Sequence, residues 1–194
     1  MNVMILIEYD GSRYHGWQRQ KNAVSIQETI ENSIEKITGE KVRIIGSGRT
    51  DAGVHALGQV ANFRTNTRIP IDKLPYAINS QLPNDIVIKG ARIVPEDFHA
   101  RFSAKEKTYA YKIYNSPYPS PLLRNYSYFF TNPLDVGAMT GAGKRFIGTH
   151  DFSAFRATGS PVKTTVREIY QLSIQRSRDL ITIQIAANGF LYNM

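Results

Sequence analysis

The sequence predicts an α/β protein of the α+β class, built as two α/β halves. Three observations support this class. Short apolar segments rich in β-branched residues recur along the chain, helical segments separate some of them in the first hundred residues, and a second series of strand-like segments begins after about residue 104. A chain of 194 residues is also long enough to bury about 70% of its unfolded surface without disulfide or metal support.

The first expected element is a strand over 3–9, an apolar and β-branched run that ends before Asp10. The clearest helix follows. Ser25 is a suitable N-cap, and Glu28 three residues later completes the pattern of a capping box. Gly39 is a typical stop signal for this helix. Four isoleucines fall on one face of it at helical spacing: Ile26, Ile30, Ile34 and Ile37.

Three further strands and one helix complete the first half. The strands are expected at 42–45, 59–64 and 86–94. Between the last two, Asp72 is a suitable cap for a helix over 73–80, with Pro75 tolerated in its first turn. The order of elements is then β-α-β-β-α-β, the split βαβ pattern of ferredoxin-like and RNA-recognition folds.

The second half shows the same kinds of signal again. The expected elements are strands at 108–114 and 126–130, a weak helix at 134–147, and a hairpin of 165–175 with 180–187. The helix is weak because each of its three glycines costs about 1 kcal/mol relative to alanine. The boundary near residue 104 predicts an N-terminal domain, 1–104, and a C-terminal domain, 105–194.

Composition narrows the classes of function. The chain has 24 Lys and Arg against 16 Asp and Glu, a formal charge of +8, which favours a polyanionic partner. It has no cysteine, which excludes disulfides, Cys-ligated zinc, iron–sulfur clusters and thiol nucleophiles. The apolar run at 3–7 lacks a basic leader, and no stretch approaches the roughly 18 apolar residues of a membrane span. We therefore expect a cytoplasmic protein with no membrane partner.

The loop at 46–56 is the strongest candidate for chemistry. Glycines at positions 46, 48 and 53 allow a ligand to approach the backbone closely. Arg49 and Asp51 place a cation and a carboxylate two residues apart, which suits a site where the cation binds an anion and the carboxylate reacts. The alternative is a surface turn whose aspartate hydrogen-bonds its own backbone. The glycine spacing fits neither the phosphate loop nor the dinucleotide fingerprint.

Three other clusters each allow two interpretations. Residues 15–20 place Trp17 among a cation and amides, which suits base stacking and phosphate contacts, or a lid over the core. Residues 98–107 interleave aromatic and basic side chains, either as a nucleic-acid contact or as a solvated linker. His150 and Asp151 are adjacent and would not share a helix face, so no metal site is expected there.

Several of these segments, in the same order from end to end, resemble the bacterial tRNA pseudouridine synthases of the TruA type. The most specific motif is GRTDAGVHA at 48–56. The others are YDG at 9–11, HGWQRQ at 15–20, FHAR at 98–101, KTYAY at 107–111, HDFSAF at 150–155 and NGFLYNM at 188–194.

The resemblance implies two halves of RNA-recognition-like topology, whose antiparallel sheets flank a basic central cleft. It implies an enzyme that isomerises uridine to pseudouridine in the anticodon stem-loop of tRNA, at tRNA positions 38–40, with no cofactor and no metal. It also implies a homodimer in which each tRNA contacts both subunits.

The resemblance further assigns roles to four residues. Asp51 matches the catalytic aspartate, which acts as a nucleophile or as a base at the sugar. Arg49 matches an arginine that pairs with this aspartate and helps to displace the target base. Tyr109 matches a tyrosine that stacks on the uracil and assists removal of its C5 proton. Leu191 matches a leucine that packs near the catalytic loop.

Members of this family continue for several dozen residues beyond the segment 188–194, where a basic residue pairs with the catalytic aspartate. We therefore expect a C-terminally truncated chain that has lost a packed helix, so that its activity as given is a matter for assay. The main alternative is a non-catalytic RNA-binding protein on the same scaffold. A phosphate-binding hydrolase using residues 46–53 is a third option, but it would need a metal or a cluster of bases.

Overall fold

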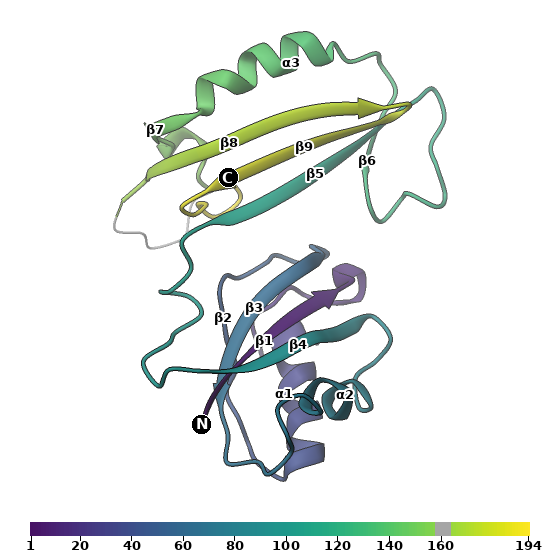
Figure 1. Ribbon diagram of the computed structural model, residues 1–194. Coiled ribbons are helices and arrows are strands. Elements are labelled where there is room, and N and C mark those ends of the chain that lie inside the picture. Colours follow the sequence, from purple (N-terminus) through teal and green to yellow (C-terminus); the bar gives the residue numbers. More distant parts are fainter. Residues whose placement is uncertain (158–163) are drawn as a thin grey trace. The chain divides into compact units, whose positions relative to one another are not determined.

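The structure is a computed structural model that describes residues 1–157 and 164–194. The chain divides into two compact units, Met1–Ala104 and Lys105–Met194. Each unit consists of one mainly antiparallel sheet with few helices (Figure 1). The predicted α+β class is therefore confirmed.

The first unit has the element order β1-α1-β2-β3-α2-β4 that the sequence predicts. Its strands are β1 (Asn2–Tyr9), β2 (Ile45–Gly46), β3 (Ala56–Arg64) and β4 (Ile86–Val94), and its helices are α1 (Ile26–Thr38) and α2 (Leu74–Asn79). The sheet order is β2-β3-β1-β4, and all neighbours are antiparallel. Figure 1 shows both helices on the same side of this sheet.

The signals at the ends of α1 are confirmed. The Ser25 hydroxyl accepts a hydrogen bond from the Glu28 N–H at 3.3 Å, and Gly39 ends the helix with φ of +72°. The Glu28 carboxylate forms an ion pair with Arg19 at 3.3 Å. The apolar face is buried against the sheet, as expected. Its fully buried members are Ile26, Ile30 and Ile34, and Ile37 is partly buried.

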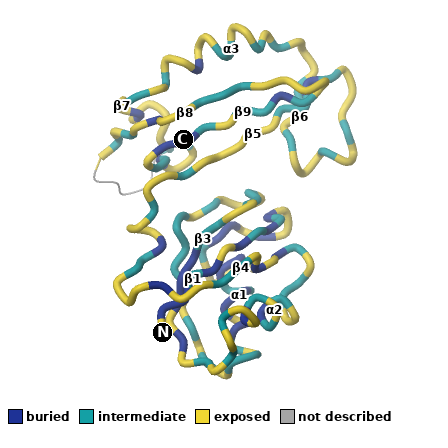
Figure 2. The backbone as a smooth tube through the Cα atoms, in the orientation of Figure 1, coloured by how far each residue is buried: buried dark blue, intermediate teal, exposed yellow. Residues whose placement is uncertain are grey.

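Alternate residues of β1 supply the other side of this core. Val3, Ile5 and Ile7 are fully buried and pack with the α1 isoleucines and with Leu74 and Ile78 of α2. Figure 2 shows the resulting concentration of buried backbone in β1 and the elements around it. This apolar layer fixes where the strands end, and hence where the loops between them begin.

Two predicted elements differ in extent. The strand predicted at 42–45 is reduced to Ile45–Gly46, because the Ile44 N–H donates to a Glu31 carboxylate oxygen (3.0 Å) and its C=O accepts from Gln27 (3.2 Å). The helix predicted at 73–80 begins at Leu74. Asp72 does not cap it, since the first turn is closed by the N–H groups of residues 73 and 74 donating to the Pro70 C=O.

The second unit is a five-stranded sheet in the order β6-β5-β9-β8-β7. The strands are β5 (Lys107–Asn115), β6 (Tyr128–Phe130), β7 (Gly148–Asp151), β8 (Val166–Ser177) and β9 (Leu180–Ala187). All neighbours are antiparallel except β5 and β6, which are parallel. The predicted hairpin is β8–β9, with Arg178 in the left-handed region (φ +54°) at its two-residue turn.

The single α-helix described in this unit, α3 (Val136–Gly143), is shorter than the segment predicted at 134–147, and a 3₁₀ helix, Lys144–Phe146, follows it. Its last glycine lies close to β8: a Cβ there would be 2.7 Å from a Leu172 methyl, so the leucine side chain would have to shift to admit one. The sequence did not predict β7, a short strand whose residues are largely exposed and carry no apolar alternation. Among the described residues, no helix is long and apolar enough to span a membrane.

Candidate active site

The 46–56 loop connects β2 to β3 in the first unit. Its first residues lie against β3, because the Ser47 N–H donates to the Val60 C=O at 2.8 Å and the Gln59 side chain donates to the Gly48 C=O at 2.6 Å. The sheet therefore determines the path of the loop up to Arg49.

The rest of the loop lies against the segment after β1, residues 10–19, which we call the anchoring segment. The Trp17 N–H donates to the Thr50 C=O at 3.0 Å, and the Gly53 N–H donates to the Tyr14 C=O at 3.2 Å. At the end of β1, the Tyr9 and Thr50 hydroxyls are 2.8 Å apart. These contacts position the backbone on both sides of Asp51.

Close approach between the two segments depends on Gly16 and Gly11. Gly16 has φ of +82°, and a Cβ at that position would lie 2.3 Å from the Thr50 carbonyl oxygen. A Cβ at Gly11 would lie 2.0 Å from the Val54 carbonyl oxygen. Any side chain at either position would therefore push the loop away.

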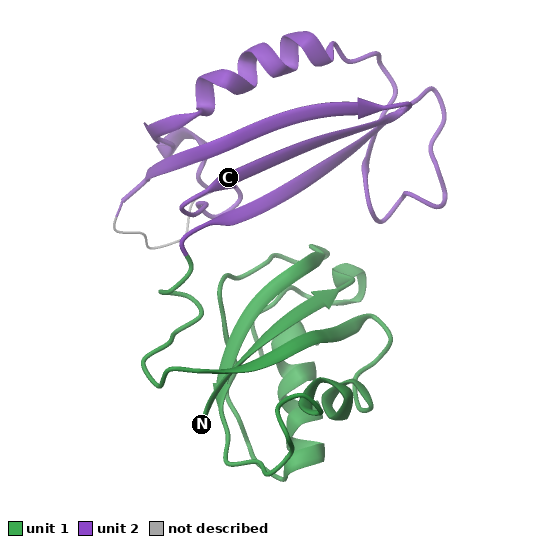
Figure 3. Ribbon diagram, in the orientation of Figure 1, with its two compact units in different colours: residues 1–104 green, residues 105–194 purple. Residues whose placement is uncertain are grey.

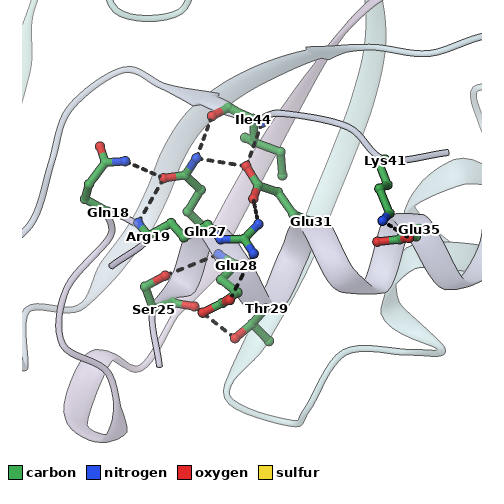
Figure 4. Close-up of polar contacts among 10 residues, drawn as sticks. All are labelled: Gln18, Arg19, Ser25, Gln27, Glu28, Thr29, Glu31, Glu35, Lys41 and Ile44. Atoms are coloured by element: carbon green, nitrogen blue, oxygen red, sulfur yellow. Dashed lines mark hydrogen bonds and ion pairs between the residues drawn. The ribbon is translucent and has the colours of Figure 1, made fainter. Parts of the chain in front are cut away.

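The anchoring segment is itself attached at both ends. At its start, the Asp85 carboxylate binds Arg13 and Tyr14. At its end, Gln27 of α1 accepts hydrogen bonds from the Gln18 side chain (2.9 Å) and from the Arg19 N–H (3.1 Å), as Figure 4 shows. The Arg19 guanidinium also forms ion pairs with Glu28 and with the buried Glu31, both at 3.3 Å.

The two charged residues of the loop do not take part in these contacts. Arg49 and Asp51 are exposed. Within residues 1–157 and 164–194, neither side chain forms a hydrogen bond or an ion pair, so the expected pairing of Arg49 with Asp51 is not observed. In contrast, the carboxylates of Asp10, Asp135 and Asp151 each accept an N–H bond from their own turn, at 2.9 Å. At Asp51 the turn is closed by backbone alone, since the Val54 N–H donates to the Asp51 C=O at 3.2 Å and no such bond to the carboxylate occurs among the described residues.

The second unit, residues 105–194 (purple in Figure 3), includes the other two predicted site residues in its sequence range. Tyr109 of β5 is 37% exposed, and its ring is perpendicular to that of Phe190 with centroids 4.9 Å apart. Leu191 is 5% exposed and belongs to the core of this unit, with Phe152, Ile169 and Ala187. Arg49 and Asp51 thus lie on one loop of the first unit. In the second unit, Tyr109 lies near the start of β5, and Leu191 lies just after the end of β9.

Comparison with known proteins identifies the family of this chain. The family model for tRNA pseudouridine synthases matches residues 5–103 and 142–194. The chain belongs to this family. It is 56% identical over 193 residues to tRNA pseudouridine synthase A of Thermoanaerobacter sp. (strain X514) and, at the same identity and length, to that of Acetivibrio thermocellus. It is 51% identical over 195 residues to tRNA pseudouridine synthase A 2 of Clostridium tetani. Each alignment covers 100% of this chain and 79% of the relative.

Burial distinguishes the two interpretations for the Trp17 cluster but not for the cluster at 98–107. Trp17 is 2% exposed and packs over Gly46, so it is a lid on the core and does not offer a stacking surface. Phe102 is 76% exposed and stacks on His99 with centroids 4.3 Å apart, and a nucleic-acid contact at 98–107 stays a prediction.

His150 and Asp151 have structural contacts. His150 Nε2 lies 2.9 Å from the Ile147 C=O. Hydrogen bonds from the Thr165 hydroxyl and the Ser153 N–H lower the pKa of the Asp151 carboxyl below its ordinary value. Among the described residues, no group of three potential metal-ligating side chains occurs.

Proposed function

We propose that this chain isomerises uridine to pseudouridine in the anticodon stem-loop of tRNA, at tRNA positions 38–40, with Asp51 as the essential catalytic residue. The proposal rests on the difference between the backbone of the 46–56 loop and its Asp51 side chain. Its backbone is fixed by bonds to the sheet and to the anchoring segment, while the Asp51 carboxylate is exposed and has no structural bond among the described residues. Membership of the family supports the same reaction.

The reaction requires a group that acts at the sugar. The bond between C1′ and N1 of uridine breaks, the detached uracil turns, and C5 bonds to C1′; C5 then loses its proton and N1 gains one, so that substrate and product are isomers. An ionised carboxylate serves this sequence as a nucleophile at C1′ or as a base at the sugar. Because no electron or group enters or leaves, the reaction needs no redox cofactor.

Arg49 and Tyr109 would handle the target base. A uridine must leave its stack before it reacts, which costs a few kcal/mol. Arg49, exposed two residues before Asp51, would insert at the vacated position or bind the adjacent phosphate. The partly exposed Tyr109 ring would stack on the displaced uracil and assist removal of the C5 proton. Leu191 would have the role of the matching leucine of the family, which packs near the catalytic loop. A homodimer in which one tRNA contacts both subunits completes the proposal.

The net charge of +8 fits a tRNA partner. Contacts between lysine or arginine and phosphates release counterions, so affinity for tRNA should fall steeply as salt rises. Because the chain has 24 lysines and arginines, tRNA binding should survive the loss of a single catalytic carboxylate.

Release of tritium from C5-labelled uridine in tRNA tests the proposal. Asp51→Asn should abolish release while tRNA binding stays at the wild-type level. The matched control is Asp72→Asn, which changes an exposed aspartate of the same unit whose one ion-pair partner among the described residues is neighbouring Lys73. Retained turnover in Asp51→Asn would reject the assignment. Absence of release by the wild-type protein at substoichiometric concentration would leave the non-catalytic RNA-binding alternative.

The role of Tyr109 needs its own variant. Tyr109→Phe keeps the ring and its contact with Phe190 but removes the hydroxyl. It should bind tRNA as the wild type does and turn over far more slowly. A wild-type rate would remove the hydroxyl from the mechanism while leaving the stacking role in place.

A further inference from the structure

Asp85, the residue immediately before β4, binds three residues of the anchoring segment. Its Oδ1 accepts a hydrogen bond from the Tyr14 hydroxyl at 2.7 Å, and its Oδ2 accepts two from the Arg13 guanidinium, at 2.9 and 2.5 Å. Its backbone C=O accepts from the Asp10 N–H at 2.9 Å. The carboxylate is only 14% exposed, so its position is well defined by these partners.

The same segment continues directly to the loop that carries Asp51. Tyr14, whose hydroxyl donates to Asp85, accepts the Gly53 N–H with its own carbonyl. Three residues later, Trp17 donates to the Thr50 C=O. Thr50 and Gly53 lie on either side of Asp51, so a shift of the anchoring segment would move the Asp51 backbone.

The protonation of Tyr14 favours this arrangement at physiological pH. Burial raises the pKa of the Tyr14 phenol above its ordinary value, and the hydrogen bond to Asp85 raises it further. The phenol is therefore neutral and donates to the carboxylate. Asp85 also raises the pKa of the Arg13 guanidinium through a hydrogen bond and its negative charge.

We propose that Asp85 is a positioning residue for the isomerisation: it orients the anchoring segment through Arg13 and Tyr14, and thereby holds Asp51 at the place where the sugar must react. This inference rests on the proposed function. A displacement of a reacting group by about 1 Å can lower turnover about a hundredfold. The effect of Asp85 should therefore be on turnover and not on tRNA binding.

At its other end, the anchoring segment is bound by Glu31 through Arg19, and a substitution there should have a different effect. The Glu31 carboxylate is 6% exposed and also binds the Ile44 N–H inside the fold, so its loss would disturb the core as well as the segment. The Arg13 partner of Asp85 is 74% exposed, and ion pairs at such positions add little to stability. A substitution at Asp85 should therefore shift the anchoring segment without unfolding the first unit.

The experiment measures kcat and KM for tRNA separately in the full chain. Asp85→Asn and Tyr14→Phe are compared with the wild type and with the Asp72→Asn control. We expect kcat to fall about tenfold to a hundredfold in Asp85→Asn and less in Tyr14→Phe, with KM changed less than about threefold. Hydrogen exchange should become faster at the Trp17 and Gly53 amides but not in α1. Trp17 is the single tryptophan of the chain, and its emission should shift to the red.

Each outcome decides the question. Wild-type kcat and unchanged exchange in Asp85→Asn would overturn the proposal, as would faster exchange throughout the first unit, because the role would then be generally structural. If Asp85→Asn does not fold, Tyr14→Phe alone carries the test, since it removes only one hydroxyl. Absence of turnover in the wild type would instead overturn the proposed function, which separates the two failures.

Discussion

The two units of this chain differ in how much apolar surface they bury. In the described residues, sixteen buried apolar side chains form the core cluster of the first unit, whereas four form that of the second. The sheet of the second unit also exposes large aromatic side chains: Tyr111, Tyr128 and Tyr170. The proposed reacting carboxylate therefore belongs to the unit with the deeper core, and the proposed stacking tyrosine to the unit with the thinner one.

The difference extends to polar groups. The first unit buries the side chains of Asn2, Gln27, Glu31 and Asn62, whereas among the described residues of the second unit only Asn115 is a buried polar residue. In both units, no buried side-chain nitrogen or oxygen of the described residues lacks a hydrogen-bond partner. Satisfied polar groups inside a core select one arrangement among the alternatives. A group that must act on a sugar carbon needs such fixed geometry, whereas a ring that stacks on a base tolerates small displacements.

Removing a core side chain should give the largest effect on stability. Ile30→Ala in α1 should cost about 2–5 kcal/mol, because Ile30 is fully buried and the neighbouring isoleucines cannot close the cavity. Ile169→Ala removes the same volume from the four-residue cluster and should deprotect the whole second unit in hydrogen exchange. The exposed Ile93→Ala should cost less than about 0.5 kcal/mol. If Ile30→Ala and Ile169→Ala leave their own units equally protected from hydrogen exchange, the second unit does not have the weaker core.

Gly16→Ala tests the fit between the anchoring segment and the loop. Gly39→Ala is the matched control, since Gly39 has a similar positive φ (+72°) but no atom within 4 Å of an added Cβ. The control should cost about 1–2 kcal/mol from backbone conformation alone. Gly16→Ala should cost a further 1–3 kcal/mol or so from the clash with Thr50, and should also lower turnover. Equal costs in urea unfolding would show that the loop yields easily.

Removing the N-cap of a helix should cost the two units similar amounts of stability. Ser25 caps α1 and Asp135 caps α3, each by accepting an N–H bond from the residue three positions later. Ser25→Ala and Asp135→Ala should each cost about 1 kcal/mol. If chemical unfolding gives similar losses in the free energy of unfolding for the two variants, the units differ in their cores and not in their helix caps. A much larger loss for Asp135→Ala would instead indicate that the second unit depends on its single described helix.

The smallest expected effect is the contribution of Tyr14 to stability at alkaline pH. The pKa of Tyr14 is raised in the folded state, so its contribution to stability is present in full below the unfolded pKa of about 10 and is lost as pH rises beyond it. The free energy of unfolding should therefore fall less steeply above about pH 10 in Tyr14→Phe than in the wild type. Parallel curves across this range would contradict the assignment of the raised pKa to the folded state.

Local sequence signals predicted much of the fold. The capping residue, the isoleucine spacing and the stop glycine of α1 are all encoded within fifteen residues, and the apolar run of β1 and the turn of the β8–β9 hairpin are equally local. In contrast, β7 has no apolar alternation, and β2 was predicted too long because the bonds of Ile44 to α1 have no trace in its own segment. An acidic residue on the inner side of a helix, as Glu31 proves to be, was the one available signal for the network in Figure 4.

The sequence alone therefore determined the class of fold, the order of elements in the first unit and the loop that carries Arg49 and Asp51, because periodicity, capping and glycine spacing act between near neighbours. Only the tertiary structure decided what positions that loop. Tyr9 meets Thr50 across 41 residues of chain, and Tyr14 meets Asp85 across 71. Hydrogen bonds over such separations form only after the sheet has brought the strand ends together, so no local pattern in the sequence specifies them.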